Sequence, residues 1–240
     1  MKEPSMNEPI KLTAARKPYK GVNMEGWIAR WYTRTRRNDM ADFRRQAASV
    51  AERLPGGGRV LEVAPGPGFF SIELAKLGNF QVTGLDISRS FVEMAAAGAR
   101  AAGVAVDFRW GSASAMPFAD ESFDFVYCMA AFKNFSEPVK ALDEMHRVLR
   151  PGGQAAILDL RKDVSLADID AYVKQSGRRR IDAWLTRWTF RHFLIKRAYT
   201  QDDLRRMAEQ SRFGRCQIEL DQIGLELRLT KPAQTAANVA

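Results

Sequence analysis

The chain has 240 residues, 46% of them hydrophobic, which is long enough for one globular domain with a full core. No apolar stretch reaches the length of a membrane-spanning helix, and the N-terminus lacks the apolar region of a secretory signal, so we expect a cytoplasmic protein. The two cysteines and two histidines have no zinc-ligand spacing; we therefore expect buried, reduced thiols and no metal site.

The formal net charge of +9 is concentrated in two segments, residues 11–45 and 178–215, where basic residues greatly outnumber acidic ones. Such segments contact nucleic acid, an anionic membrane surface or an acidic substrate, or they form a solvated surface that keeps a protein soluble. The sequence leaves these interpretations open, and it leaves the oligomeric state open as well.

At the N-terminus, residues 1–20 are polar and rich in proline, which predicts a loose tail. A helical pattern begins at Met24, because Trp27, Ile28, Trp31 and Tyr32 recur at intervals of three and four residues. A second helix is predicted over residues 41–54 and ends at the proline and three glycines of residues 55–58.

A nucleotide-binding βαβ unit is predicted next. Residues 59–63 form a short apolar run typical of a buried parallel strand, residues 64–68 break it with two Pro-Gly pairs, and a helical pattern follows from Phe69. Gly66 and Gly68 permit a tight turn and let a ligand approach bare backbone. The second strand, residues 81–86, ends on Asp86, where a carboxylate can accept hydrogen bonds from both hydroxyls of a ribose.

The remaining pattern alternates helices and strands. Helices are predicted over residues 89–102, with Ser88 as N-cap, 137–149 and 200–211; strands are predicted over 104–110, 123–129 and 154–160, and a hairpin over 216–220 and 225–230. Between the fifth strand and the last helix lies an insertion, about residues 164–197, with two helical stretches, and residues 232–240 look frayed. The order predicts an α/β fold, a doubly wound seven-stranded sheet that is mostly parallel.

Five segments occur in an order and spacing that resemble class I S-adenosylmethionine (SAM)-dependent methyltransferases. They are residues 62–68, 84–86, 111–118, 122–126 and 147–153. The branch they resemble most is the type 11 group, which includes ubiquinone and menaquinone C-methyltransferases. The resemblance implies a Rossmann-like sheet with a terminal antiparallel strand. It implies one domain over residues 21–231, with N-terminal cap helices (21–55) that close the site and a helical insertion (164–198), flanked by a flexible tail (1–20) and a disordered tail (232–240).

The resemblance also implies SAM as the cofactor and assigns its contacts. Glu62 would orient the methionine ammonium, Asp86 would accept from the ribose hydroxyls, and Ile87 would pack on the adenine ring. The remaining implied cofactor contacts are the turn residues Ala64, Gly66 and Gly68, the adenine-edge residues Ser112 and Ala113, and Met129 and Ala130 at the methyl-transfer cleft.

Three positions depart from the family pattern. Ala64 stands where many relatives have a third glycine, and Ser112 stands where many have an aspartate that accepts from the adenine amino group. Lys133 and Asn134 replace a frequent His-rich pair; they would contact polar groups of SAM or the acceptor, or lie in solvent.

The N-terminal helices and the insertion supply aromatic side chains for a small-molecule acceptor pocket. The expected lining residues are Trp27, Trp31, Tyr32, Phe132, Trp184 and Trp188. No catalytic base can be identified with a partner, and the candidates are His192 and Tyr32. An acidic phenol or an activated carbon nucleophile needs little assistance, so the absence of a base does not argue against methyl transfer.

The sequence therefore predicts a SAM-dependent methyltransferase that acts on a small aromatic or lipid-like acceptor by direct in-line displacement. Two alternatives stay open: an RNA methyltransferase whose basic segments contact phosphates, and a non-catalytic SAM-binding protein. Dinucleotide-dependent oxidoreductases of similar fold have a third glycine at the position near Ser71. The Pro-Gly-Gly turn at residues 151–153 also argues against that class of enzyme.

Overall fold

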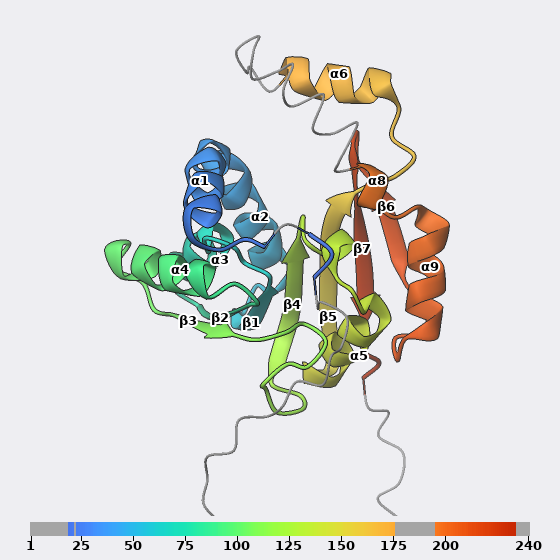
Figure 1. Cartoon of the computed structure of the whole chain (residues 1–240). Helices are drawn as coiled ribbons and strands as arrows, with labels where there is room; N and C mark the ends of the chain where they lie inside the picture. Colours follow the sequence, from blue (N-terminus) through green and yellow to red (C-terminus); the bar gives the residue numbers. More distant parts are fainter. Residues whose placement is uncertain (1–18, 22, 176–194, 234–240) are drawn as a thin grey trace, which may run out of the picture.

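The computed structural model describes residues 19–21, 23–175 and 195–233, and one seven-stranded sheet forms its centre (Figure 1). The strands are β1 (Gly58–Val63), β2 (Phe80–Asp86), β3 (Val106–Trp110), β4 (Phe123–Met129), β5 (Leu149–Leu160), β6 (Gln217–Leu220) and β7 (Gly224–Thr230). Their order across the sheet is β3-β2-β1-β4-β5-β7-β6. Strands β1 to β5 run parallel to one another, and β7 pairs antiparallel with β5 and β6. The order reverses between β1 and β4, and a ligand site is expected outside the carboxyl ends of strands at such a reversal.

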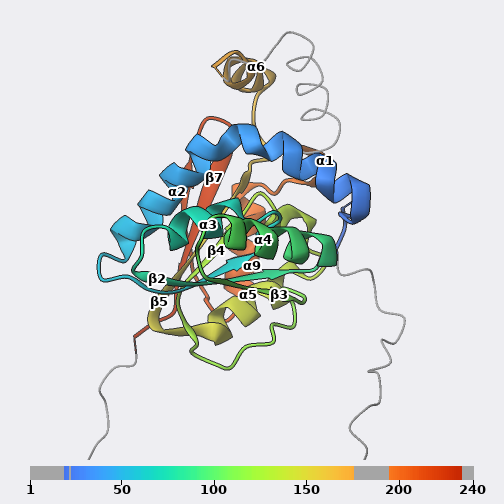
Figure 2. The same ribbon diagram turned by 90° about the vertical axis from the view of Figure 1, so that its left-hand side faces the viewer.

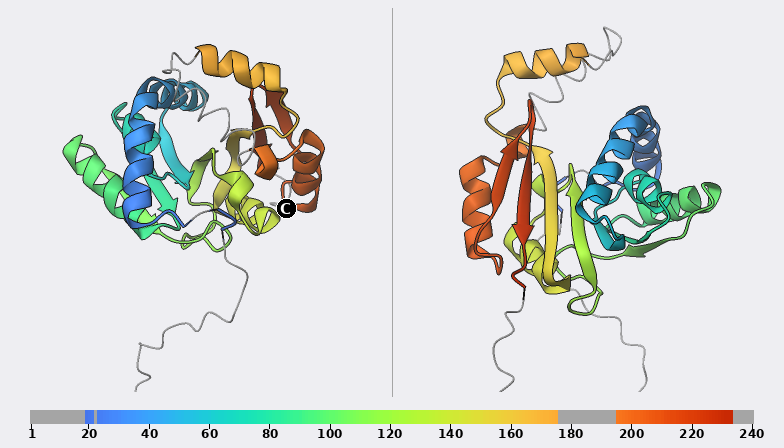
Figure 3. Two further views of the ribbon diagram at one scale, coloured as in Figure 1. Left: turned by 45° about the horizontal axis from the view of Figure 1, so that its top comes forward. Right: turned by 180° about the vertical axis from the view of Figure 1, so that it is seen from behind.

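Helices cover both faces of the sheet. They are α1 (Gly26–Arg36), the 3₁₀ turn η1 (Arg37–Asp39), α2 (Met40–Arg53), α3 (Phe69–Ala75), α4 (Arg89–Ala101), η2 (Phe132–Asn134), α5 (Pro138–Val148), α6 (Leu166–Gln175), α8 (Ile195–Arg197) and α9 (Gln201–Gln210). Helices α1 to α4 gather on one side of the molecule, and α5 and α9 lie on the other (Figures 1 and 3). Figure 2 shows α1 crossing above α3 and α4. Among the described helices, none has the length and apolar character needed to cross a bilayer.

The alternation of side chains along each strand divides the core into two layers. Val60 and Phe125 belong to the layer under α2 and α3, whereas their sequence neighbours Leu61 and Val126 belong to the layer under α5 and α9. Both sets are almost fully buried, since all four side chains are at most 1% exposed. Strands buried on both faces read as continuous apolar runs, which is why the central strands could be recognised from sequence.

The predicted seven-stranded, mostly parallel fold with its terminal antiparallel strand is confirmed. One boundary differs: β5 begins at Leu149 rather than Gln154, because Leu149 pairs with Phe123 and the pairing resumes at Gln154 after a register shift. Two residues of the predicted tail are ordered. The backbone of Tyr19 pairs with Phe135, and the Lys20 amide donates to the Asn134 carbonyl oxygen at 2.8 Å. The domain limits stay a prediction, and residues 176–194 of the predicted insertion lie outside the described residues.

Packing between the sheet and α3 gives a stability prediction. The ring of Phe70 stacks on Tyr127 with centroids 4.2 Å apart, and Phe70 has no exposed surface. Phe70→Ala should lower the free energy of unfolding by about 3–5 kcal/mol, because it removes buried apolar area and leaves a cavity. Urea unfolding measures this loss. Leu77→Ala, at a side chain that is 49% exposed, is the control and should change stability by less than about 0.5 kcal/mol. Equal effects of both substitutions would contradict the packing described.

Candidate functional site

The turn between β1 and α3 is shaped by backbone conformations that favour glycine. Gly66 and Gly68 have φ of +54° and +76°, and Ala64 has φ of +58°. A Cβ on Gly68 would lie 2.7 Å from Phe108 and 2.8 Å from Ala95, so no larger residue fits there. Gly66 is also buried, but a Cβ there would meet Tyr32 and Phe91 only at ordinary contact distances of 3.9 and 4.0 Å. Of the two glycines, Gly66 is therefore the less tightly enclosed, and the side chains that cover it are Tyr32 and Phe91.

Asp86, the last residue of β2, holds this turn in place. Its Oδ2 accepts from the Gly66 amide at 2.9 Å, and its Oδ1 accepts from the Ser88 amide at 2.8 Å. The side chain is 5% exposed, and burial raises the pKa of the carboxyl to about 6. A carboxylate can accept about four hydrogen bonds, so each oxygen retains capacity for one further donor, such as a ribose hydroxyl.

Glu62 is a second buried acid next to the turn. It is 3% exposed, and its Oε2 accepts from both the amide and the hydroxyl of Ser71 on α3. Burial, with a smaller contribution from the nearby charge of Asp86, raises the pKa of Glu62 to about 7. Within the described part of the chain neither carboxylate forms an ion pair. The site thus contains two acids whose charge no protein cation balances.

Two phenols from the N-terminal part of the chain face this region. The ring of Tyr32, on α1, meets Phe91 edge-on with centroids 5.7 Å apart, and it is the side chain nearest to a Cβ built on Gly66, at 3.9 Å. Burial raises the pKa of Tyr32, and burial with the charges of Tyr32, Asp86 and Asp159 raises that of Tyr19 to about 12. Both hydroxyls stay protonated near neutral pH, so they suit hydrogen-bond donation better than general-base catalysis.

A buried ion pair fixes the chain after β4. Lys133 and Asp159 are 4% and 7% exposed, with Nζ 2.6 Å from Oδ1, and Nζ also donates to the carbonyl of Ala130 at 2.7 Å. Ala130 has φ of +57°, so the lysine supports a strained residue at the carboxyl end of β4. Solvent exposure, one of the two expectations for Lys133, is therefore wrong: the side chain is drawn inside by Asp159 at the end of β5.

The adenine-side residues lie at the ends of β2 and β3. The carbonyl of Ile87 accepts from the Trp110 indole at 2.9 Å, and the Arg89 guanidinium lies 4.1 Å from the centroid of that indole ring. The Ser112 hydroxyl accepts from the Ser114 amide at 3.2 Å. Ser112 and Ala113 are partly buried, and their contact with adenine stays a prediction.

The expected acceptor residues do not gather in one place. Trp27 and Trp31 lie on the outer face of α1, 70% and 59% exposed, whereas Tyr32 faces inward. Phe132 is 1% exposed and packs against Phe135 and Tyr199 in the core. The other expected residues, Trp184, Trp188 and His192, lie outside the described residues. The composition of the acceptor pocket stays a prediction.

Asp159 is the residue that the sequence interpretation missed. Its position at the carboxyl end of β5, next to the predicted methyl-transfer strand β4, was the available signal, because parallel strands end at one edge of a sheet. Nothing in the sequence pattern linked it to Lys133, which lies 26 residues earlier.

Comparison with known proteins agrees with this geometry. Residues 61–157 match the methyltransferase domain family. A demethylmenaquinone methyltransferase of Deinococcus radiodurans is 36% identical over 116 residues, which cover 48% of this chain and 48% of that protein. The O-methyltransferase resE of Aspergillus sclerotiorum is 32% identical over 134 residues, which cover 54% and 51%. The chain thus matches about half the length of these curated relatives.

Over residues 61–157 the chain is therefore similar to the methyltransferase domain of the type 11 branch of class I SAM-dependent methyltransferases. Solved structures agree on the fold of the methyltransferase domain. A proposed SAM-dependent methyltransferase from Methanococcus maripaludis superposes with a TM-score of 0.70 at 19% identity, covering 97% of this chain and 100% of that one. A SAM-dependent methyltransferase from Aquifex aeolicus superposes with a TM-score of 0.58 at 18% identity, covering 77% and 89%.

SAM is the cofactor that this domain family uses, and the residues present fit it. SAM carries an ammonium and a sulfonium cation, and the methyltransferase domain has two buried carboxylates without a cationic partner among the described residues. The Gly66 amide donates directly to one of them, Asp86. A positively charged ligand bound there would balance a charge that the protein leaves uncompensated.

The raised pKa values of Glu62 and Asp86 predict that the cofactor-free protein loses stability as pH rises. A carboxyl group with a higher pKa in the folded state contributes stability below its unfolded pKa and loses it as pH rises through its folded pKa. With folded values of about 7 and about 6, this window runs from about pH 4 to about pH 7.

Urea unfolding across that window tests the electrostatics, with Glu62→Gln as the diagnostic variant. Glutamine keeps an acceptor for Ser71 but does not titrate, so the loss of stability with pH should shrink by on the order of 3 kcal/mol. SAM binding favours the ionised carboxylates and should therefore tighten over the same window. Identical pH profiles for the variant and the parent would show that the pKa of Glu62 is not raised.

The buried pair gives a separate prediction. Lys133→Met leaves Asp159 charged and without its cation, and should lower the free energy of unfolding by about 3–5 kcal/mol. The double variant Lys133→Met/Asp159→Asn removes the charge and keeps an acceptor for one of the two amides, those of Lys133 and Leu160, that donate to Asp159. It should be more stable than Lys133→Met alone in urea unfolding. A double variant as unstable as the single one would mean that the ion pair is not the source of the loss.

Proposed function

We propose that the protein transfers the methyl group of SAM to a small aromatic or lipid-like acceptor by direct in-line displacement. The observation that carries the proposal is the pair of buried acids at the glycine turn, Glu62 and Asp86, which have no cationic partner among the described residues. A bound SAM supplies an electrophilic methyl group on a sulfonium, so the protein's task is to hold and aim the reactants.

The described residues divide that task. Asp86 would hold the ribose hydroxyls with its remaining acceptor sites, and Glu62 would orient the ammonium. The Lys133–Asp159 pair would keep Ala130, at the end of β4, in the conformation that borders the transfer cleft. Tyr19 and Tyr32 would donate hydrogen bonds to the bound molecules, because their raised pKa values keep the hydroxyls protonated.

The acceptor class rests on two considerations. Relatives over half of the chain are named as a demethylmenaquinone methyltransferase and an O-methyltransferase. Both phenols in the described part of the site are poorly suited to remove a proton, and His146 lies elsewhere, on α5 against Phe213. An acceptor whose nucleophile ionises or activates easily, such as an acidic phenol or a hydroquinone carbon, suits a site of this kind.

Substitution of Asp86 tests the cofactor assignment. Asp86→Ala removes charge-assisted hydrogen bonds worth roughly 1.5–3 kcal/mol each, so the affinity for SAM should fall at least about tenfold. Asp107→Ala is the matched control, since Asp107 is an exposed carboxylate of the neighbouring strand that pairs with Arg109. Isothermal titration calorimetry measures both, after circular dichroism has verified folding. An unchanged dissociation constant in Asp86→Ala would refute the ribose assignment.

Transfer itself requires an acceptor screen. Radiolabelled methyl from SAM should appear in at least one member of a panel of phenols, hydroquinones and demethylated quinones, and not in RNA. Tight SAM binding without transfer to the panel would favour a non-catalytic SAM-binding protein, and label in RNA would favour the nucleic-acid alternative. Either result would overturn the acceptor proposal while leaving the cofactor assignment to the calorimetric test.

A further inference from the structure

The outer face of α1 is unusual for a surface helix. Trp27 and Trp31 are 70% and 59% exposed and lie one turn apart, and Arg30 and Arg34 are exposed beside them. Indole side chains of this size are rarely left in water on a helix that already packs its opposite face. Two such side chains at neighbouring turns, interleaved with arginine, indicate that this face of α1 is a binding surface for another molecule or a membrane.

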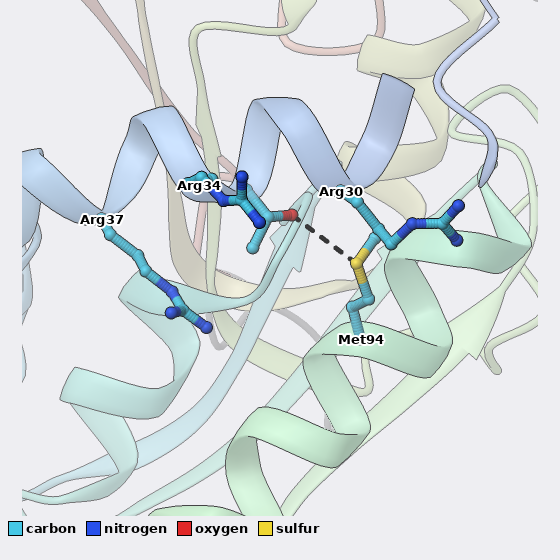
Figure 4. A pocket seen from close by; sticks show the side chains of 5 residues that line it. Arg30, Arg34, Arg37 and Met94 are labelled. Carbon is cyan, nitrogen blue, oxygen red and sulfur yellow. Dashed lines mark hydrogen bonds between the residues drawn. The ribbon is translucent and has the colours of Figure 1, made fainter. Parts of the chain in front are cut away.

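The arginines of this face have no acidic partner. Figure 4 shows Arg30, Arg34 and Arg37 along the side of α1 that borders α4, above Met94. They line a groove of about 210 Å³ together with Thr33, whose hydroxyl donates to the Met94 sulfur at 3.7 Å. None of the three forms an ion pair among the described residues.

The neighbouring arginine on the inner side differs. Arg36 pairs with Asp39 at 2.6 Å and lies over the ring of Phe43. Arg36 therefore has an acidic partner, whereas Arg30, Arg34 and Arg37, which line one pocket on α1 and η1, have none among the described residues. Their mutual repulsion is relieved by a surface that carries several negative charges at once.

We propose that α1 docks on an anionic lipid bilayer, with Trp27 and Trp31 at the boundary of the hydrocarbon and Arg30, Arg34 and Arg37 at the headgroup phosphates. Tryptophan favours membrane interfaces because its ring is apolar and its N–H is polar, and helices that lie on membranes combine basic and aromatic residues in this way. The phosphates of anionic lipids supply the negative charge that the three arginines lack.

The arrangement favours a bilayer over a nucleic acid. Single-stranded nucleic acid is held in a basic groove whose aromatic residues stack on the bases. Here the groove is lined by arginine, threonine and methionine, and both tryptophans stand outside it on the exposed face of the helix. Exposed aromatic side chains on a helix surface, flanked by cations, match a flat charged surface.

Docking through α1 would also orient the site. The inner face of the same helix carries Tyr32, whose ring is 3.9 Å from where a Cβ on Gly66 would lie, so α1 stands between the glycine turn and the outer surface. Under the proposed function, docking would bring the SAM site close to lipid in which a hydrophobic acceptor is dissolved. The vesicle test below uses neither SAM nor acceptor, so its result is independent of the proposed activity.

Co-sedimentation of the full chain with vesicles tests the docking. The protein should bind vesicles of phosphatidylcholine with phosphatidylglycerol and not vesicles of phosphatidylcholine alone, and salt should weaken the binding. Replacing Arg30, Arg34 and Arg37 with glutamine should lower the vesicle affinity about fivefold per arginine. Trp27→Ala/Trp31→Ala should lower it as well, whereas Leu220→Ala, 49% exposed on the edge strand β6, should not.

A charge-matched control separates docking from general attraction. Arg205, Arg206 and Arg212, in and just after α9 on the other side of the molecule, are exposed and can be replaced with glutamine together. This control should keep vesicle binding, and the α1 arginine variant should keep its SAM affinity and thermal unfolding temperature. Equal losses in both arginine variants, no vesicle binding by the parent, or binding of single-stranded RNA in place of vesicles would each overturn the proposal.

Discussion

Asp86 is the carboxylate on which the geometry of the site depends, because it joins two turns that come from different strands. Its two oxygens accept the amides of Gly66 and Ser88, and the Ser88 hydroxyl in turn caps α4 by accepting from Phe91. The turn after β1 is therefore tied to the turn after β2 and to the first turn of a helix. Close packing also requires glycine at position 68, since Phe108 and Ala95 leave no room for a side chain there.

The buried carboxylates fall into two groups, one with a cationic partner and one without. Asp159 receives its own cation, Lys133, and both are enclosed by protein. Asp86 and Glu62 receive backbone amides and a serine hydroxyl but no cation among the described residues, and their pKa values rise accordingly. Burying carboxylates without a counter-charge destabilises a fold. The arrangement is understandable if a cationic ligand completes it, and the ammonium and sulfonium of SAM are such cations.

Periodicity and glycine placement were sufficient to predict the sheet and the turn from the sequence. Buried parallel strands are continuous apolar runs, and positive φ at Gly66 and Gly68 follows from the strand-turn-helix pattern. Long-range pairing could not be predicted in the same way. The inward turn of Lys133 depends on Asp159 in another strand, and the outward position of Trp27 depends on which side of α1 meets α4. Helical spacing gives the faces of a helix but does not say which of them is covered.

Helix α1 shows how one short segment can serve two surfaces. Its inner residues follow the spacing of Ala29 and Tyr32 and pack toward Phe91 and the glycine turn. Its outer residues repeat the same spacing with tryptophan and arginine, at positions where alanine or glutamate would keep the helix equally stable. The exposed rings of Trp27 and Trp31 do not stabilise the folded state of a lone monomer, because they remain in water. The composition of the outer face would be explained by the proposed contact with a bilayer, while the inner face of the same helix covers the glycine turn through Tyr32.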